Sequence, residues 1–321
     1  MIIKELPEKD YEKYTTLNTE YGTIFTSISF LNLFKDISKI YGIYKNDEQL
    51  IGGFYLAINK RKNIKLLWTV PYAPYIGPFY KEDQISYVSQ LDFQKTLNTE
   101  LAKFIDGLKY PVVSLKLSYN ISDTQPYTWN KFKVVPNFSY ILNLSQTEDQ
   151  IWDNMASENR NDIRKGEKEG LKVNQTADYK IVFDLIKKTY NRKNVTGNES
   201  TLKKILFEFA NKENSFAMVC LKEGEPVSTS FCIFDKHAAY YLLGGYDEKK
   251  KHHSAGTMNI WESIKFSKKL NLKKFDFEGS MIPEIEKYFR KFGGTLTPLY
   301  RINKASMPLE VLLKIFKREL F

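Results

Sequence analysis

Two carboxylates at the end of a predicted strand are the residues of this sequence with the clearest capacity for chemistry. Asp276 and Glu278 alternate with Phe275 and Phe277, and the run ends in Gly279-Ser280. Alternate side chains of a strand point to opposite faces, so the two acids are expected to share one face. Two carboxylates at the C-terminal end of a strand, beside a glycine turn, lie where α/β sheets commonly bind ligands. The alternative is a solvated edge with ordinary surface acids.

A second set of candidate groups lies on the predicted strand from Ala238 to Tyr246. Gly244 and its neighbour Gly245 permit a close approach of the backbone, so amide N–H groups near them are predicted to bind an oxyanion. Tyr241 is predicted to act as an acid, with core packing as the alternative.

Basic residues form a stripe on the helix predicted after residue 145. Arg160, Arg164 and Lys168 are four residues apart and therefore lie on one side of a helix. Such a stripe could contact the phosphates of tRNA or of a nucleotide-linked substrate. The alternative is a solvated, ion-paired face, since acidic residues lie between them. These acids are Glu158, Asp162, Glu167 and Glu169.

The composition bounds the kind of protein. The chain has 321 residues and a formal net charge of +10, with 17 basic and 14 acidic residues before residue 146 and 31 and 24 after it. A basic balance favours anionic partners. Only two cysteines occur, Cys220 and Cys232, and no zinc-type spacing joins them to His252 and His253, so neither a disulfide scaffold nor a metal site is expected. No signal peptide or spanning segment is visible, and the prediction is a soluble cytoplasmic protein.

The order of helices and strands is easier to predict after residue 145 than before it. A capping-box pattern at Ser145 to Glu148 predicts a helix through Ile163 that ends near Gly166 to Gly170. Two more helices, three antiparallel strand-like runs and a polar loop from Asp247 to Gly256 follow, and a helix is predicted from Thr257 to Leu270. The remaining elements are the carboxylate strand, a helix from Pro283, a strand from Thr295 to Ile302 and a last helix from Pro308 to Leu320.

The part before residue 146 repeats this order loosely. Helices are predicted near its start, then strands at Ile40 to Lys45, Leu50 to Asn59 and Ile64 to Thr69, then a long helix and a strand from Val112 to Ser118. The hairpin at residue 45 matches that at residue 222 with an offset of 177. We predict an α/β (α+β) protein of two similar domains, 1–145 and 146–321.

Three segments resemble the GNAT acyltransferase superfamily, and the doubling resembles its FemABX members, the peptidoglycan bridge-forming aminoacyltransferases. They are the basic helix of residues 157–170, the run Ser254-Ala255-Gly256-Thr257, and residues 275–280 with 289–294. The resemblance implies two tandem GNAT-like domains, each with a mixed, mainly antiparallel sheet flanked by helices. It also implies transfer of an acyl or aminoacyl group from acyl-CoA or aminoacyl-tRNA to an amine, in cell-envelope or peptidoglycan precursor synthesis as one option.

The resemblance also implies binding residues. A GNAT pyrophosphate loop has Gln or Arg, two residues, Gly, one residue, and Gly or Ala, before a helix N-terminus. Here His253 and Met258 replace the first and last positions, and Met258 would crowd the phosphate. The predicted binding residues are Arg160, Arg164, Lys165, Gly244, His253, Gly256, Thr257, Ser280 and Arg290.

Two functions follow from this reading. The first is an N-acyltransferase with Asp276, Glu278 and Tyr241 as catalytic residues, with CoA or tRNA as donor and no tightly bound cofactor. The second is a catalytically silent GNAT-like module that binds an anionic polymer or glycan, because the phosphate loop is degenerate. The last helix, with its leucines and lysines, is expected to dock on its own domain or, alternatively, to rest on a membrane.

Overall fold

The computed structural model describes residues 1–321 except 62, 82–85, 193–198, 251, 280 and 321. The chain forms two compact units, which are described separately. Unit 1 comprises residues 1–137 and 298–321, and unit 2 comprises residues 138–297. The predicted division was a single boundary after residue 145. The last 24 residues of the chain belong with the first unit.

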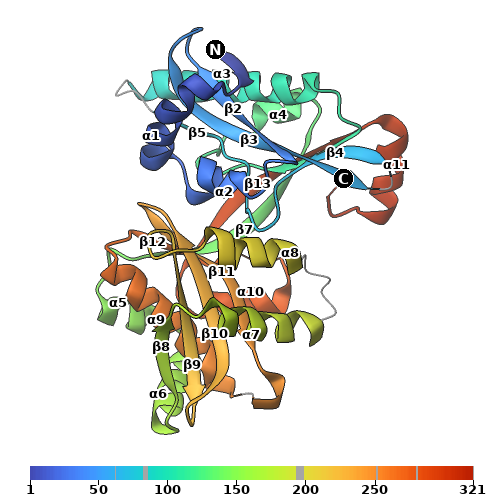
Figure 1. Cartoon of the computed structure of the whole chain (residues 1–321). Helices are drawn as coiled ribbons and strands as arrows, with labels where there is room; N and C mark the ends of the chain where they lie inside the picture. Colours follow the sequence, from blue (N-terminus) through green and yellow to red (C-terminus); the bar gives the residue numbers. More distant parts are fainter. Residues whose placement is uncertain (62, 82–85, 193–198, 251, 280, 321) are drawn as a thin grey trace. The chain divides into compact units, whose positions relative to one another are not determined.

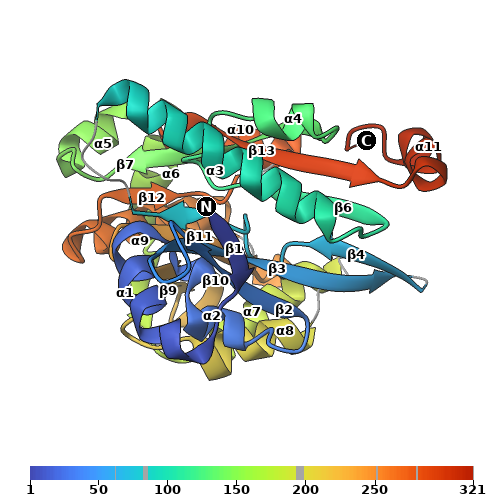
Figure 2. The ribbon, with the colours of Figure 1, turned by 90° about the horizontal axis from the view of Figure 1, so that it is seen from above.

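Unit 1 is built on a sheet with helices on it (Figures 1 and 2). Its strands follow the order β1 (Ile2–Glu5), β2 (Ser38–Tyr44), β3 (Leu50–Arg61), β4 (Ile64–Trp68), β6 (Val112–Lys116) and β13 (Thr295–Ala305), with β5 (Phe79–Tyr80) paired to β3. Only the β4–β6 pair is parallel among these. The helices are α1 (Tyr11–Tyr21), α2 (Ile28–Asn32), α3 (Tyr87–Gly107), α4 (Gln125–Trp129) and α11 (Met307–Phe316).

Unit 2 contains the second sheet region. Its strands follow the order β7 (Lys133–Asn143), β12 (Lys274–Asp276), β11 (Ala238–Tyr246), β10 (Glu225–Phe234), β9 (Ser215–Lys222) and β8 (Lys172–Thr176). The unit boundaries fall inside β7 and β13, so residues 133–137 belong to unit 1 and residues 295–297 to unit 2. The β11–β12 pair is parallel and the other pairs from β7 to β8 are antiparallel. The helices are α5 (Glu148–Asn154), α6 (Ser157–Lys168), α7 (Tyr179–Arg192), α8 (Glu199–Lys203), a π-helix at Lys204–Phe209, α9 (His253–Lys269) and α10 (Pro283–Arg290). The predicted mixed, mainly antiparallel α/β architecture is confirmed.

Helices α9 and α7 cover opposite faces of the unit 2 sheet. Ser230 and Gly244 are register partners, and the Ser230 hydroxyl lies 2.8 Å from that of Ser263 on α9. The next pair along, Thr229 and Gly245, faces the other way, where a Cβ on Gly245 would come within 2.6 Å of backbone atoms of α7. Neighbouring strand residues point to opposite faces, so the sheet is enclosed on both sides.

Several boundaries differ from the sequence predictions. The helix predicted from Ser145 is two helices, α5 and α6, and the capping box that forms is Thr147 with Gln150. The helix expected from Thr257 begins at His253, so the predicted phosphate loop is mostly helix. Residues 71–78, which contain three prolines and two tyrosines, form a largely buried connection in unit 1. Both hairpins matched at the offset of 177, β2–β3 and β9–β10, are present.

Candidate active site

Strands β11 and β12 separate where the candidate site begins. Their parallel pairing includes Tyr240 with Asp276 and goes no further, although β11 continues to Tyr246. On its other side β11 stays paired with β10 as far as Tyr246. In the described part of the chain, the end of β11 therefore has no strand partner on the β12 side. Backbone groups along such an opening can pair with a substrate or bind an oxyanion.

A β-bulge brings Tyr241 and Gly244 to the same face of β11. Tyr241 pairs with Cys232 and Leu243 pairs with the preceding Phe231, so Leu242 is the extra residue. Residues three apart would otherwise point to opposite faces. A Cβ on Gly244 would lie 2.1 Å from the Tyr241 hydroxyl. The Tyr241 hydroxyl thus packs directly on Gly244, on the face of the sheet that α9 covers.

A second phenol, Tyr288 of α10, approaches the first turn of α9. A Cβ on Gly256 would lie 3.2 Å from the Tyr288 hydroxyl, which also hydrogen-bonds with the side chain of Thr257. The two glycines predicted to bind ligand therefore each lie beneath a tyrosine hydroxyl. Tyr288 was not among the predicted site residues, although it directly precedes the 289–294 run that carried part of the resemblance.

Both tyrosines stand against Phe289 and keep their protons at neutral pH. The Tyr241 and Tyr288 ring centroids lie 5.7 Å and 5.9 Å from that of Phe289. Burial raises the pKa of Tyr241 far above its ordinary value of about 10. Burial also raises the pKa of Tyr288 to about 12, although the Thr257 hydrogen bond opposes this shift. Both phenols therefore remain protonated and can donate hydrogen bonds at this apolar wall.

The N-terminus of α9 is occupied by side chains of the protein itself. His252 caps the helix, since its Nδ1 accepts from the backbone N–H of Ser254 at 3.2 Å. Its Nε2 faces the Glu169 carboxylate at 2.5 Å, and this hydrogen bond is the main reason that the pKa of Glu169 is lowered. His253 stacks on His252 and lies 3.8 Å from Asp162. A diphosphate at this helix end would meet two carboxylates.

Met258 does not crowd the helix N-terminus as predicted. It is buried and points toward α6, where a Cβ on Gly166 would come within 2.3 Å of its sulfur. Gly166 therefore lets α6 approach α9 closely. This packing places Asp162 of α6 and Glu169, the residue after α6, beside the two histidines. The α6–α9 interface therefore explains why two carboxylates lie at the N-terminus of α9.

The two predicted catalytic carboxylates have different environments. Asp276 is buried, and its Oδ1 accepts from the Ser139 hydroxyl at 2.5 Å and from the backbone N–H of Glu278 at 2.8 Å. Glu278 is half-buried with a φ of 61°, so the strand alternation expected at this position has ended. Asp276 thus turns the chain after β12, and Glu278 follows in the turn. Ser280 and Lys251, the latter in the polar loop before α9, lie outside the described residues.

The predicted basic binding residues contact protein groups. Arg160 donates to the Asp153 carbonyl oxygen at 3.2 Å, and Lys165 lies 3.9 Å from Glu169. The Arg164 guanidinium lies 5.4 Å from the centre of the Trp152 ring. Arg290 pairs with Glu286 at 3.5 Å, and Glu286 accepts from the Tyr140 hydroxyl. The structure does not bring these four cations together with the two phenols.

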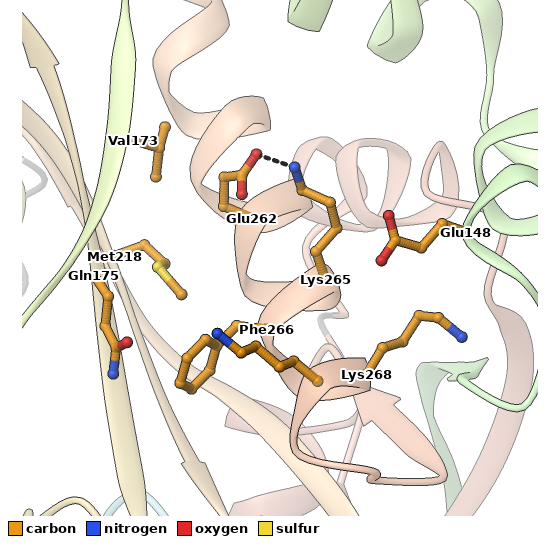
Figure 3. Close-up of a pocket in the computed structure, with 9 residues that line it drawn as sticks. Glu148, Val173, Gln175, Met218, Glu262, Lys265, Phe266 and Lys268 are labelled. Atoms are coloured by element: carbon orange, nitrogen blue, oxygen red, sulfur yellow. Dashed lines mark ion pairs between the residues drawn. The ribbon is translucent and has the colours of Figure 1, made fainter.

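A pocket of about 560 Å³ lies along the other half of α9 (Figure 3). Its lining residues are Glu148, Val173, Gln175, Met218, Glu262, Lys265, Phe266, Lys268 and Lys269. Lys265 pairs with Glu262 at 2.5 Å, and Lys268 donates to the carbonyl oxygens of Leu144 and Gln146. Eight residues separate Lys265 from Thr257, which is about 12 Å along a helix. This pocket is therefore distinct from the site at the two phenols.

Covalent and metal chemistry find no support in the described residues. Burial raises the pKa of Cys220 to about 12 and that of Cys232 further still, so neither thiol is a ready nucleophile. Among the described residues, no three His, Cys, Asp or Glu side chains are grouped to hold a metal ion. No described helix has the length and apolar character needed to cross a bilayer.

Comparison with known proteins gives a family match and several structural matches. Residues 156–290 match the model of the acetyltransferase (GNAT) domain. FemX superposes with a TM-score of 0.71 at 12% identity, over 98% of this chain and 100% of that one. L-PGS from Bacillus licheniformis gives 0.57 at 14%, over 100% and 99%. The C-terminal domain of a putative lysylphosphatidylglycerol synthetase from Agrobacterium fabrum gives 0.57 at 9%, over 95% of both. No curated protein matches the sequence.

Proposed function

We propose that this chain, which matches the GNAT domain over residues 156–290 and has a FemX-like fold, transfers an aminoacyl group from aminoacyl-tRNA to an amine. One observation carries the choice of donor. The N-terminus of α9, where acyl-CoA relatives hold pyrophosphate, is capped by His252 and faced by Glu169 and Asp162. Repulsion by these carboxylates disfavours a diphosphate there. An aminoacyl ester of tRNA needs no diphosphate at that position.

The reaction would proceed by direct attack of the amine. Its nitrogen forms the new C–N bond as the ester C–O bond breaks. The nitrogen loses a proton to the Glu278 carboxylate, and the departing ribose oxygen takes a proton from the Tyr288 phenol. Backbone N–H groups of β11 beside the opening would stabilise the oxyanion. Tyr241, beside Gly244, would be the second proton donor. Asp276 would position Glu278 by accepting a hydrogen bond from the backbone N–H of that residue.

The net charge of +10 supports an anionic donor of large size. The acceptor that we propose is an amine in a cell-envelope or peptidoglycan precursor, as in the family that the fold resembles. We also propose that the two units correspond to the two GNAT-like domains predicted from the sequence, with residues 298–321 joined to the first, and that the protein acts in the cytoplasm.

Donor choice is tested by calorimetric titration with acetyl-CoA and free CoA, followed by transfer assays. We expect no saturable CoA binding at micromolar concentrations, because Ser254 N–H is already bonded and Glu169 is ionised. Transfer from charged tRNA to an amine acceptor, without acetyl transfer, is the expected second result. Micromolar CoA binding with acetyl transfer would contradict the choice of donor.

Glu278→Gln is expected to lower turnover by roughly a hundredfold, because the amide cannot accept the amine proton. The free energy of unfolding should change little. The matched control is Glu284→Gln on α10, an exposed glutamate in the same unit. Equal turnover by Glu278→Gln and wild type would exclude Glu278 as the base.

A catalytically silent module is the second candidate, since the same occupied helix end also suits a domain that has lost its donor site. The two candidates differ in one measurement. Turnover of any acyl or aminoacyl donor by the purified protein excludes the silent module. Tight binding of an anionic polymer or glycan without turnover of either donor class would support it.

A further inference from the structure

Helix α11 presents a large apolar surface to solvent in unit 1. None of its residues is buried. Met307, Val311, Ile315 and Phe316 are 80%, 59%, 70% and 72% exposed. The first three are spaced by four residues, and Phe316 follows the last of them, so they form one stripe along the helix. Single exposed apolar residues are ordinary, whereas a continuous stripe marks a contact surface.

The helix is apolar on its opposite side as well. Leu309 and Leu313, four residues apart, are half-buried. A helix that is apolar on both sides is stable when both are covered. These two leucines mark the less exposed side of the helix, and docking of that side on its own domain stays a prediction. The exposed stripe requires a second apolar environment.

Basic residues outnumber acidic ones beside this stripe, although Lys314 pairs with Glu310 and Lys317 with Glu319. The Lys133 ammonium donates to the Arg318 carbonyl oxygen at 3.2 Å, so the start of β7 lies beside the segment after α11. Over residues 131–133 and 307–319 there are five basic side chains against two acidic ones, Glu310 and Glu319. The basic residues are Lys131, Lys133, Lys314, Lys317 and Arg318.

An exposed tryptophan lies close to the same segment. Trp129 of α4 is 62% exposed. The carbonyl oxygen of the next residue, Asn130, accepts from the Lys304 ammonium at 2.9 Å, and Lys304 comes three residues before α11. This contact holds the end of α4 near the start of α11 (Figure 2). Tryptophan is enriched where apolar and aqueous phases meet.

From these contacts we propose that α11, with Trp129 and the five basic residues, binds the surface of an anionic membrane. The exposed stripe would enter the boundary between headgroups and acyl chains, while the lysines and Arg318 would contact lipid phosphates. A symmetric dimer would instead bring two copies of the same positive surface together, which like-charge repulsion opposes. This proposal stands apart from the choice of acyl donor.

The test is co-sedimentation of the full chain with vesicles of phosphatidylcholine alone and of phosphatidylcholine with about 30% phosphatidylglycerol. Wild type should sediment with the anionic vesicles only, and less so at high salt. Ile315→Ser combined with Phe316→Ser should weaken binding roughly tenfold or more, because two large apolar side chains are lost. Lys131→Glu combined with Lys133→Glu should weaken binding to the anionic vesicles, because two positive charges are replaced by negative ones.

The matched control is Tyr87→Ser combined with Val88→Ser. These α3 residues are 73% and 66% exposed and lie in unit 1 at the end far from α11 (Figures 1 and 2). The control should bind vesicles like wild type, and all variants should unfold at similar temperatures. Equal binding by the Ile315/Phe316 variant, or wild type left in the supernatant, would overturn the proposal. A wild-type dimer that this variant converts to monomer would overturn it in favour of a second copy.

Discussion

Replacing Tyr288 by phenylalanine is expected to lower kcat by roughly a hundredfold or more, the usual contribution of a positioned acid. The variant loses only the hydroxyl that lies over Gly256 and bonds with Thr257, while the ring keeps its place beside Phe289. Stability should therefore fall by about 1 kcal/mol, the net value of one hydrogen bond. Turnover and thermal unfolding of the same preparation measure the two effects.

Tyr179→Phe is the matched control for this variant. Tyr179 also lies in unit 2, and its hydroxyl is 3.2 Å from that of Ser215, so its removal costs a similar bond without touching the site. Tyr241→Phe separates the two phenols, since only the residue that protonates the leaving group should control kcat. Equal kcat for Tyr288→Phe and Tyr179→Phe would show that Tyr288 is a packing residue.

The pH dependence of kcat gives a second readout of the same acid. A phenol of ordinary pKa would lose its proton, and with it the activity, near pH 10. The pKa of Tyr288 is raised to about 12, so its protonated form persists and this loss should come only above about pH 11. A fall in kcat centred near pH 10 that is absent from Tyr288→Phe would contradict the raised pKa.

Replacing Gly245 by alanine is expected to lower the free energy of unfolding by about 2–3 kcal/mol, the cost of overpacking a well-filled interior. The added Cβ would lie 2.6 Å from the backbone of Leu185 and Ile186 in α7. Backbone cannot rotate away as a side chain can, so α7 must move from β11. The Thr189 side chain joins α7 to both the N–H and the carbonyl oxygen of Tyr246, and those bonds should weaken too.

Gly107→Ala provides the control for this substitution. Gly107 is the last residue of α3, and an added Cβ there meets no atom within 4 Å. Alanine is also the better helix former, so stability should stay level or rise slightly. Chemical denaturation of both variants supplies the comparison. A Gly245→Ala protein as stable as Gly107→Ala would show that α7 and β11 are less tightly packed than the structure indicates.

Local patterns in the sequence predicted most elements near the site. The β9–β10 hairpin and the helix from Pro283 were predicted, because alternation, turn residues and an initial proline act over a few residues. The strand through Phe275 was predicted too, but it ends at Asp276 and does not include Glu278. The start of α9 was missed. The run before it is polar and rich in lysine, which is typical of a loop, yet packing of α6 through Gly166 extends the helix back to His253.

The sequence by itself determined the α/β class and the chemistry available, since these depend on residue types and short spacings. Only the tertiary structure decided which residues meet. The bulge at Leu242 turns Tyr241 over Gly244, and α10 brings Tyr288 to Gly256. The close α6–α9 contact fills the expected phosphate site with protein groups. The last 24 residues join unit 1 for the same reason, because contacts between distant segments are set by burial and shape, which no local pattern encodes.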